Sequence, residues 1–403
     1  MMTKSVPELV TYAVFGWVAL NVVFYVSERW MVFTDIIWVL MAGLGYGWLS
    51  SLGELDLPPL VMDPKVVLFV FVPLLIFAST KKMCLFHFRP IIVPALLAGT
   101  LGIIISMCVV GLSVHCFFNV PLLPSLLFGV IISATDPLAV SALFKGNKNI
   151  TENQKLLIEG ESILNDGFVV TVAGILALLI FTSTSFSWLD TSASFVSHIV
   201  GALVTGIVLG RGARAILRLM HSSYYILTTN ITLALAYGSF VVAETFHFSG
   251  ILAVFAAALA YGYKPDEDRV NRDAEEKIWA YLDYAANALL FFLLGTSFVA
   301  LTQNSTFSVL MVILAIGLLF LGRFTALSIL KPFMKIEGVA LSTMEFWLMN
   351  FSGARGAVSV ALILLLPSSF EYQSLFLATA FVMILFSLVV YPLITAKLLK
   401  QGG

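Results

Sequence analysis

Charged residues and cysteine are both scarce in this 403-residue chain. Asp, Glu, Lys and Arg make up only 11% of the residues and hydrophobic residues make up 60%, whereas a typical soluble domain is about 25% charged. This composition excludes an ordinary soluble protein and predicts an all-α polytopic membrane protein. The three cysteines, Cys84, Cys108 and Cys116, are too few for a disulfide framework and lack metal-ligand spacing. We therefore expect all three to be core residues.

Long hydrophilic segments are also lacking. No stretch is large enough for a nucleotide-binding module, so we do not expect ATP to supply energy, and we expect no cofactor and no nucleic-acid partner. The first apolar run has no small-residue cleavage site before Glu28 and Arg29. We therefore expect it to remain as a membrane span rather than to be removed as a signal peptide.

Thirteen apolar runs are long enough, or nearly long enough, to cross a bilayer. They lie at about 10–27, 36–51, 66–80, 91–115, 121–144, 155–182, 194–218, 225–243, 249–264, 281–301, 307–330, 342–366 and 372–398. With the N-terminus outside and the C-terminus inside, 18 of the 22 Lys and Arg residues fall in cytoplasmic segments and only Lys4 and Lys65 fall outside. This asymmetry follows the positive-inside rule. It predicts a multi-pass protein of the plasma membrane with membrane lipid as its surroundings.

Two aspartates, Asp136 and Asp166, lie near the middle of the fifth and sixth predicted spans. An ionisable residue at the centre of a membrane helix costs ~2.5–3.5 kcal/mol, so its presence indicates a function. Asp166 is eleven residues into its span, or about 16 Å from the cytoplasmic end of a hydrocarbon core of about 30 Å. A cation, a proton, or both in turn can use carboxylates at that depth.

Other polar residues surround these aspartates. Ser162 and Asp166 are four residues apart, as are Glu161 and Asn165, so one face of the sixth span is polar. Asp136 precedes Pro137, and a helix broken by proline at membrane depth survives only against protein or a water-filled cavity.

Glu161 and Arg323 fall at matching depths of about 9 and 11 Å from the cytoplasmic ends of their spans. Each would be costly alone in the membrane, and pairing removes most of that cost. We therefore expect an ion pair that ties the sixth span to the eleventh.

The charges in the core do not cancel. Asp136, Asp166 and Glu161 contribute three negative charges, and Arg323 and Arg355 contribute two positive charges. Two aspartates at ~4 Å would repel each other by ~4 kcal/mol at an effective dielectric constant of 20, so one proton or one monovalent cation would stabilise the set. Oxygen ligands suit hard cations, and the absence of His and Cys from this cluster argues against zinc, copper and nickel.

An inverted internal repeat is also present. The segment Ser133–Ser141 reads SATDPLAVS and the segment Ser352–Ser359 reads SGARGAVS. Each places a charged residue beside a helix breaker in mid-membrane, in spans that run in opposite directions. Broken helices at matching positions of two halves are a pointer to the binding site of a transporter.

Three motifs resemble those of the NhaP-type sodium/proton antiporters, which are related to the animal sodium/hydrogen exchangers. They are Ala-Thr-Asp-Pro at 134–137, Glu-Ser-Ile-Leu-Asn-Asp-Gly at 161–167 and Gly-Ala-Arg-Gly-Ala-Val at 353–358. The resemblance extends to Phe291–Gly295, Arg323 and Ser249–Ala253, and so covers nearly the whole chain.

The resemblance implies a single transmembrane domain over residues 1–403 that works by alternating access and forms a homodimer. The domain would hold about thirteen spans in two inverted six-helix repeats, at about 10–182 and 225–398, with a linker helix at about 194–218. The fifth and twelfth spans would be crossed discontinuous helices.

The resemblance also assigns the site residues. Asp166 would bind Na⁺ and H⁺ in turn, and Asp136, Ser162 and the carbonyl of Thr135 would complete the cation site. Asn165 would stabilise the crossing of the two discontinuous helices. An Asn directly before the Asp is typical of the electroneutral branch of the family. The remaining charges would be structural: an ion pair between Glu161 and Arg323, and Arg355 offsetting helix ends and carboxylate charge.

The third span departs from the family pattern. Many relatives carry a Glu where this chain has Ala78, so a ligand from that span would have to come from Ser79, Thr80 or water. Nearer the span ends, we expect Glu244, Asp283 and Glu345 to reach the headgroup layer. Glu159, one turn inside the cytoplasmic surface, could attract cations.

The leading prediction is a transporter, not an enzyme, that exchanges one Na⁺ or Li⁺ for one H⁺. Three alternatives remain: a K⁺/H⁺ antiporter of the same fold, a Na⁺-coupled symporter that uses Arg355 for an organic anion, and an intramembrane aspartyl protease. Asp166 follows Asn rather than the Gly-x-Gly-Asp pattern of such proteases.

Overall fold

The computed structural model describes most of the chain after residue 34. The described residues are 25, 35–52, 60, 64–81, 91–136, 140, 143–144, 147, 149–181, 188–220, 224–246, 248–262, 269–302, 309–336, 339–367 and 369–401. Their contacts form two compact units, one of Met1–Val61 with Ala288–Thr306 and one of Met62–Asn287 with Phe307–Gly403.

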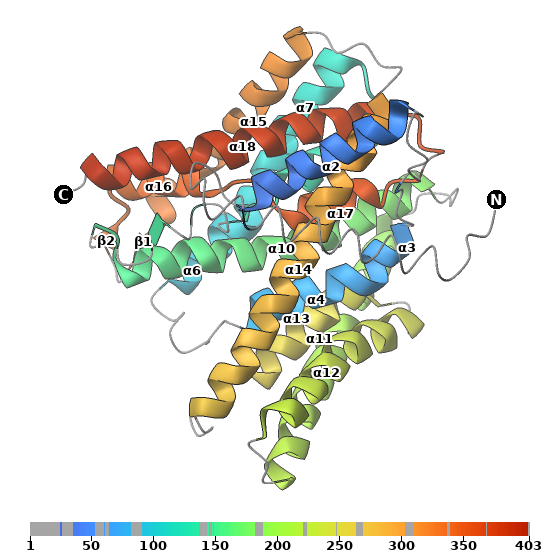
Figure 1. Ribbon diagram of the computed structural model, residues 1–403, viewed down its shortest axis with the longest axis vertical. Helices are drawn as coiled ribbons and strands as arrows, with labels where there is room; N and C mark the ends of the chain where they lie inside the picture. The colour runs from blue at the N-terminus through green and yellow to red at the C-terminus, as the bar shows by residue number, and fades with distance from the viewer. Residues whose placement is uncertain are drawn as a thin grey trace. The chain divides into compact units, whose positions relative to one another are not determined.

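The smaller unit contains α2 (Asp35–Leu52) and the second half of α14 (Arg269–Thr302) (Figure 1). These two helix segments pack with their backbones almost in contact. A Cβ atom on Gly43 would lie 2.2 Å from the Phe292 carbonyl oxygen. A Cβ atom on Gly295 would lie 2.6 Å from the Leu40 carbonyl oxygen. Small residues permit this close approach, which is a common packing device between membrane helices.

The larger unit holds the other elements, which are almost all helices (Figure 1). In chain order these are α3 (Pro64–Val66), η1 (Val67–Phe71), α4 (Val72–Lys81), α6 (Ile92–Leu96), η2 (Leu97–Gly102), α7 (Ile103–Phe118), α8 (Leu122–Ser133), α10 (Glu152–Phe181), α11 (Trp188–Leu219), α12 (Tyr225–Thr245), α13 (Gly250–Tyr261), the first half of α14, α15 (Val309–Leu330), η3 (Lys331–Phe333), β1 (Lys335–Ile336), β2 (Val339–Ala340), α16 (Thr343–Ser352), α17 (Ala357–Leu364) and α18 (Gln373–Gln401). The two short strands pair antiparallel, with Lys335 opposite Ala340.

Eight of the described helices are long and apolar enough to cross a membrane, and three shorter apolar helices accompany them. The predicted all-α polytopic fold is therefore confirmed. The first predicted span, at 10–27, lies outside the described residues. The count of thirteen spans and the boundaries of the two repeats stay predictions.

Two segments wind as π-helix, and each has a local reason. The π-helical turns of η1 run directly into Pro73 in the first turn of α4, and a proline lacks the N–H that a regular α-helix needs. In η2 the Thr100 hydroxyl donates to the Leu96 carbonyl at 2.6 Å, so a side chain competes for a backbone acceptor.

Packing between α11 and α13 depends on glycine. A Cβ atom on Gly206 would lie 2.2 Å from the Ala253 carbonyl oxygen. A Cβ atom on Gly210 would lie 2.4 Å from the Ala257 carbonyl oxygen. Glycines four residues apart form one face of α11, so the two helices meet along a continuous seam of small residues.

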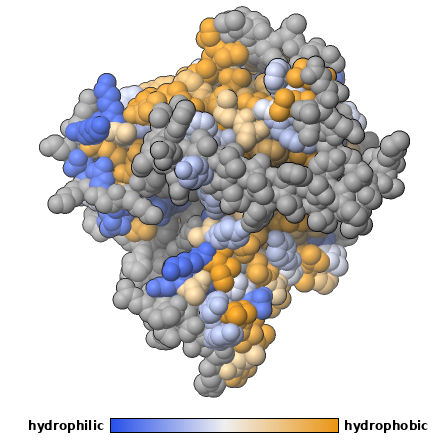
Figure 2. All heavy atoms as spheres, viewed as in Figure 1, coloured by the Kyte–Doolittle hydropathy of each residue, from blue (hydrophilic) through white to orange (hydrophobic). Residues whose placement is uncertain are grey.

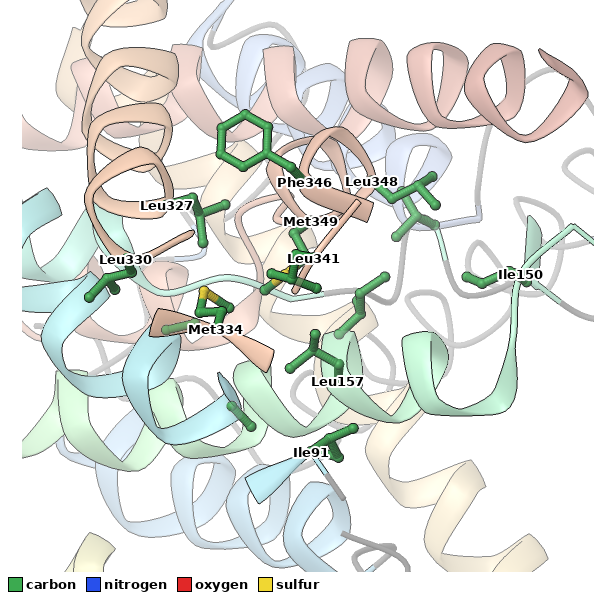
Figure 3. Close-up of a cluster of buried hydrophobic side chains, with 14 of the residues drawn as sticks. Ile91, Ile150, Leu157, Leu327, Leu330, Met334, Leu341, Phe346, Leu348 and Met349 are labelled. Atoms are coloured by element: carbon green, nitrogen blue, oxygen red, sulfur yellow. The ribbon is translucent and has the colours of Figure 1, made fainter. Parts of the chain in front are cut away.

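A hydrophobic cluster joins α10, α15 and α16 near the helix breaks described below. Leu157, Leu327, Met334, Phe346 and Met349 are all less than 8% exposed and converge in Figure 3. Leu157 lies one turn before Glu161 on α10, and Leu327 lies one turn after Arg323 on α15. This cluster therefore fixes the two helices on which the predicted ion pair stands.

Hydrophobic residues are widespread among the coloured residues of Figure 2. Hydrophilic residues gather at the left of that view, near the end of α18 and the β1–β2 hairpin. Lys335, Lys397 and Lys400 are exposed in these segments. All three belong to loops predicted to be cytoplasmic, and the orientation itself stays a prediction.

Candidate cation site

Two interrupted helices meet at the predicted breaks. Helix α8 ends at Ser133, and the chain after it is extended, with φ −58° and ψ 137° at Ala134. Helices α16 and α17 are separated by the residues 353–356. The Asp136 N–H donates to the Ala354 carbonyl at 2.7 Å, as an isolated antiparallel bridge. The structure thus shows an interruption in both the fifth and the twelfth predicted spans and brings the two interruptions together.

Gly356 is required at this meeting point because of space. A Cβ atom there would lie 2.2 Å from the Asp136 Cβ and 2.3 Å from its Oδ2. Any larger residue would therefore displace the Asp136 side chain.

Arg355 places a buried positive charge at the end of α8. It is 1% exposed, and its Nη1 lies 3.4 Å from the Ser133 carbonyl oxygen and 3.3 Å from that of Ala134. A cation at the carboxyl end of a helix is stabilised by the unpaired carbonyls and the helix dipole. Arg355 therefore lies where the sequence predicted, against a helix end beside the crossing.

Helix α10 holds the unwound residue Thr135 through two side chains. Ser162 Oγ donates to the Thr135 carbonyl at 2.6 Å, Asn165 Nδ2 donates to Thr135 Oγ1 at 2.5 Å, and the Thr135 N–H lies 3.4 Å from Asn165 Oδ1. Thr135, Ser162 and Asn165 are all buried. The Thr135 carbonyl has a second lone pair, so the bond from Ser162 leaves one free for a cation.

Glu161 and Arg323 form a bidentate ion pair, with Nη1–Oε1 and Nη2–Oε2 distances of 2.7 and 2.9 Å. Arg323 also donates to the Met349 carbonyl from Nε at 2.9 Å and from Nη2 at 2.5 Å. Glu161 is 2% exposed and Arg323 is 6% exposed. The pair predicted from matching depths is present, and it connects α10, α15 and α16 without a net charge.

The two aspartates remain accessible within this buried frame. Asp136 and Asp166 are both partly exposed, whereas their neighbours Thr135, Ser162 and Asn165 are buried. Within the described residues, Asp166 accepts no hydrogen bond and forms no ion pair. Its carboxylate can therefore accept a proton or a cation without first breaking a bond to the described part of the chain.

A further carboxylate, Asp283, lies inside the long helix α14. We expected Asp283 to reach the headgroup layer because it stands at the start of an apolar run. Helix α14 begins fourteen residues earlier, at Arg269, and continues for 34 residues. Asp283 is therefore inside a long helix, and its depth in the membrane stays a prediction.

A second polar cluster was also missed. Lys81 Nζ lies 2.5 Å from Glu275 Oε1, Thr232 Oγ1 donates to the same carboxylate at 3.3 Å, and Trp279 Nε1 donates to Thr232 at 3.0 Å. The Glu275 side chain is only 3% exposed. Long-range contacts between α4, α12 and α14 create this cluster, so no spacing in the sequence indicates it.

The third predicted span carries Ala78 at the position where many relatives carry a Glu. Ala78 is 1% exposed and has no polar group. Thr80 is equally buried, and its Oγ1 has no hydrogen-bond partner among the described residues. The described residues contain no group of three or more His, Cys, Asp or Glu side chains that could hold a metal ion.

Comparisons with known proteins agree with the motifs. The family described as "Sodium/hydrogen exchanger, transmembrane" matches residues 3–401. The Na⁺/H⁺ antiporter NhaP of Pseudomonas aeruginosa is 29% identical over 404 residues, which cover 94% of this chain and 93% of that protein. The Na⁺/H⁺ antiporter NhaH of Halobacillus aidingensis is 28% identical over 345 residues, covering 84% and 83%.

Among solved structures, the sodium proton antiporter MjNhaP1 from Methanocaldococcus jannaschii at pH 8 superposes with a TM-score of 0.77. The match covers 97% of this chain and 98% of that one at 19% sequence identity. This likeness shows the fold.

Proposed function

Because the chain belongs to the sodium/hydrogen exchanger family and resembles its NhaP-type antiporters, we propose that it exchanges one Na⁺ or Li⁺ for one H⁺ across the plasma membrane. The observation that carries the proposal is Asp166. Its carboxylate is partly exposed and has no bonding partner among the described residues, although Asp136 lies nearby and buried polar residues surround it. Such a group binds either a cation or a proton, and each excludes the other.

The cation would be held by oxygen atoms alone. Asp166, Asp136, the Ser162 hydroxyl and the Thr135 carbonyl offer hard oxygen ligands, which suit Na⁺ and Li⁺. Asn165 would keep Thr135 in place through the contacts it makes with that residue.

The charge balance at the crossing supports a one-for-one exchange. Glu161 and Arg323 neutralise each other, and Arg355 offsets one of the two aspartates at the crossing. One negative charge remains for one monovalent ion. If H⁺ and Na⁺ replace each other on it, each cycle moves no net charge.

Alternating access would carry the site from one side of the membrane to the other. We further propose that the protein acts as a homodimer in lipid, with its N-terminus outside and its C-terminus in the cytoplasm. The mass of the detergent-solubilised protein tests the dimer, and labelling of cysteines introduced at each terminus in intact cells tests the orientation.

Flux in proteoliposomes tests the function. We expect a pH gradient to drive Na⁺ uptake at a rate that is unchanged when the membrane is clamped at different voltages. Uptake that generates a potential would contradict the one-for-one exchange. Parallel assays with Li⁺ and K⁺ separate the proposal from K⁺/H⁺ exchange by the same fold.

Substitution of Asp166 tests the site. Asp166→Asn keeps the shape of the side chain but removes its charge, so we expect exchange to be abolished. Asp273→Asn is the matched control, because Asp273 is exposed on α14, and it should exchange like wild type. Full activity of Asp166→Asn would overturn the assignment.

A further inference from the structure

Helix α18 carries a buried polar stripe within an otherwise apolar stretch. Ser387, Tyr391 and Thr395 follow one another at intervals of four residues, and residues four apart lie on the same face of a helix. All three are at most 1% exposed. A hydroxyl group inside an apolar core is costly unless it is hydrogen-bonded, so the partners of this stripe indicate what it does.

Ser387 binds the backbone between α16 and α17. The Arg355 N–H, which lies outside both helices, donates to Ser387 Oγ at 3.0 Å. Ser387 donates its own hydrogen to the Ile384 carbonyl within α18, also at 3.0 Å. That bond leaves the lone pairs of the Ser387 oxygen for Arg355. A backbone donor that the helix break removes from regular bonding is thus satisfied by α18.

Thr395 binds the end of α16. The last four carbonyls of a helix have no partner within it, and Phe351 is the second-last residue of α16. The Phe351 carbonyl accepts a hydrogen bond from Thr395 Oγ1 at 3.1 Å. The Tyr391 ring meets the Phe351 ring edge to face at a centroid distance of 5.4 Å. The stripe therefore contacts the backbone of the second break at two points.

The first break is held in the same way by α10. Ser162 donates to the Thr135 carbonyl at 2.6 Å, and Asn165 Oδ1 lies 3.4 Å from the Thr135 N–H. Each break thus has one backbone carbonyl and one backbone N–H bound by polar side chains of a long neighbouring helix. In the predicted inverted repeats, α10 is the sixth span and α18 the thirteenth, so the two helices are counterparts.

We propose that Ser387 and Thr395 are positioning residues, which hold the unwound segment of the second break so that the cation site keeps its binding geometry. The link to the site is the Ala354 carbonyl, directly before the N–H that Ser387 binds. It accepts the Asp136 N–H at 2.7 Å, so movement of the segment would displace Asp136. The effect on Na⁺ affinity rests on the proposed antiport function, whereas the effect on the segment does not.

Hydrogen exchange measured by mass spectrometry tests the hold on the segment. Ser387→Ala removes the acceptor of the Arg355 N–H, and Thr395→Val removes a donor while nearly preserving the shape of the side chain. We expect the backbone amides of 353–356 to exchange about fivefold faster in each variant, the factor that corresponds to the net loss of one hydrogen bond. Exchange in the rest of α18 should remain at the wild-type rate.

Sodium uptake in proteoliposomes tests the effect on the site. We expect the KM for Na⁺ to rise about fivefold in both variants, because the lost hydrogen bond displaces a cation ligand, while the maximal rate stays within about twofold of wild type. Thr395→Ser retains the hydroxyl and should keep the wild-type KM. Thr379→Val is the matched control, because Thr379 is also buried on α18 but donates to the Leu375 carbonyl of its own helix.

Each result decides the proposal. A wild-type KM in either Ser387→Ala or Thr395→Val overturns it, and so does an equal rise of KM in Thr379→Val, which indicates a general loss of packing. If Ser387→Ala yields no folded protein, Thr395→Val and Thr395→Ser decide alone, and equal KM values in these two variants overturn the proposal. If the wild-type protein shows no Na⁺/H⁺ exchange, the proposed function fails, and hydrogen exchange of 353–356 still decides whether α18 holds the second break.

Discussion

At the scale of single residues, the stability of the core depends on how its buried charges are paired. Arg323 satisfies Glu161 with two hydrogen bonds and donates two more, from Nε and Nη2, to the Met349 carbonyl. Both side chains are almost fully buried. A buried pair of this kind does not add much stability over apolar residues, but removal of one partner leaves an uncompensated charge in the core.

We therefore predict that Arg323→Met destabilises the protein by roughly 3–5 kcal/mol, the range found when one partner of a buried pair is lost. Thermal or denaturant unfolding in detergent measures the change. The matched control breaks the exposed pair of Glu152 and Lys155, in which Glu152 is 79% exposed; Glu152→Gln should cost less than about 1 kcal/mol. Equal effects of the two substitutions would contradict the prediction.

At the scale of elements, the arrangement depends on how closely two unwound segments approach each other. The hydrogen bond from Asp136 to Ala354 and the absence of a side chain at Gly356 keep these segments together. Asn165 and Ser162 then fix the first segment to α10.

Gly356→Ala should separate the two segments, because the added methyl group would overlap the Asp136 side chain. Overpacking in a core costs about 1–3 kcal/mol, and a displacement of about 1 Å at a reacting site can reduce rates about 100-fold. We expect Na⁺ uptake to fall by about 10- to 100-fold. Gly174→Ala is the control, since a Cβ atom on Gly174 meets nothing within 4 Å; comparable losses in both variants would disprove the steric explanation.

Much of this site could be predicted from the sequence, because the cost of a charge in lipid makes buried charges conspicuous. Asp136, Asp166, Glu161 and Arg323 stood out by their positions within the predicted spans, and the helix breaks by Pro137 and by Gly353 and Gly356. The roles of Thr135, Ser162 and Asn165 came from the family resemblance. The sequence could not show the contact between Asp136 and Ala354, since it joins segments more than 200 residues apart.

The Lys81–Glu275 pair was missed for a different reason. Hydropathy marks where an apolar run begins, whereas α14 extends well before its apolar run. A polar residue at the edge of such a run therefore looks superficial although it lies within the helix, and the partner of each charge depends on tertiary packing.

At the scale of the whole molecule, the proposed competition sets how the transport rate depends on pH. If one proton and one Na⁺ exclude each other, binding of Na⁺ weakens as the proton concentration rises. On the acidic side of the profile we expect the KM for Na⁺ to rise about tenfold for each unit by which pH falls, as linkage of a single proton requires. The maximal rate should stay constant. Initial rates of ²²Na⁺ uptake over a range of pH measure both, and a KM independent of pH would exclude competition.

The neutrality of the Glu161–Arg323 pair has an electrical consequence. The potential across a membrane performs work of about 2.3 kcal/mol on each elementary charge per 100 mV, but almost none on a closely spaced pair of opposite sign. Movement of this pair within the protein can therefore proceed against a strongly polarised membrane with little energetic penalty, and the field acts instead on the cargo, on Arg355 and on the aspartates at the crossing.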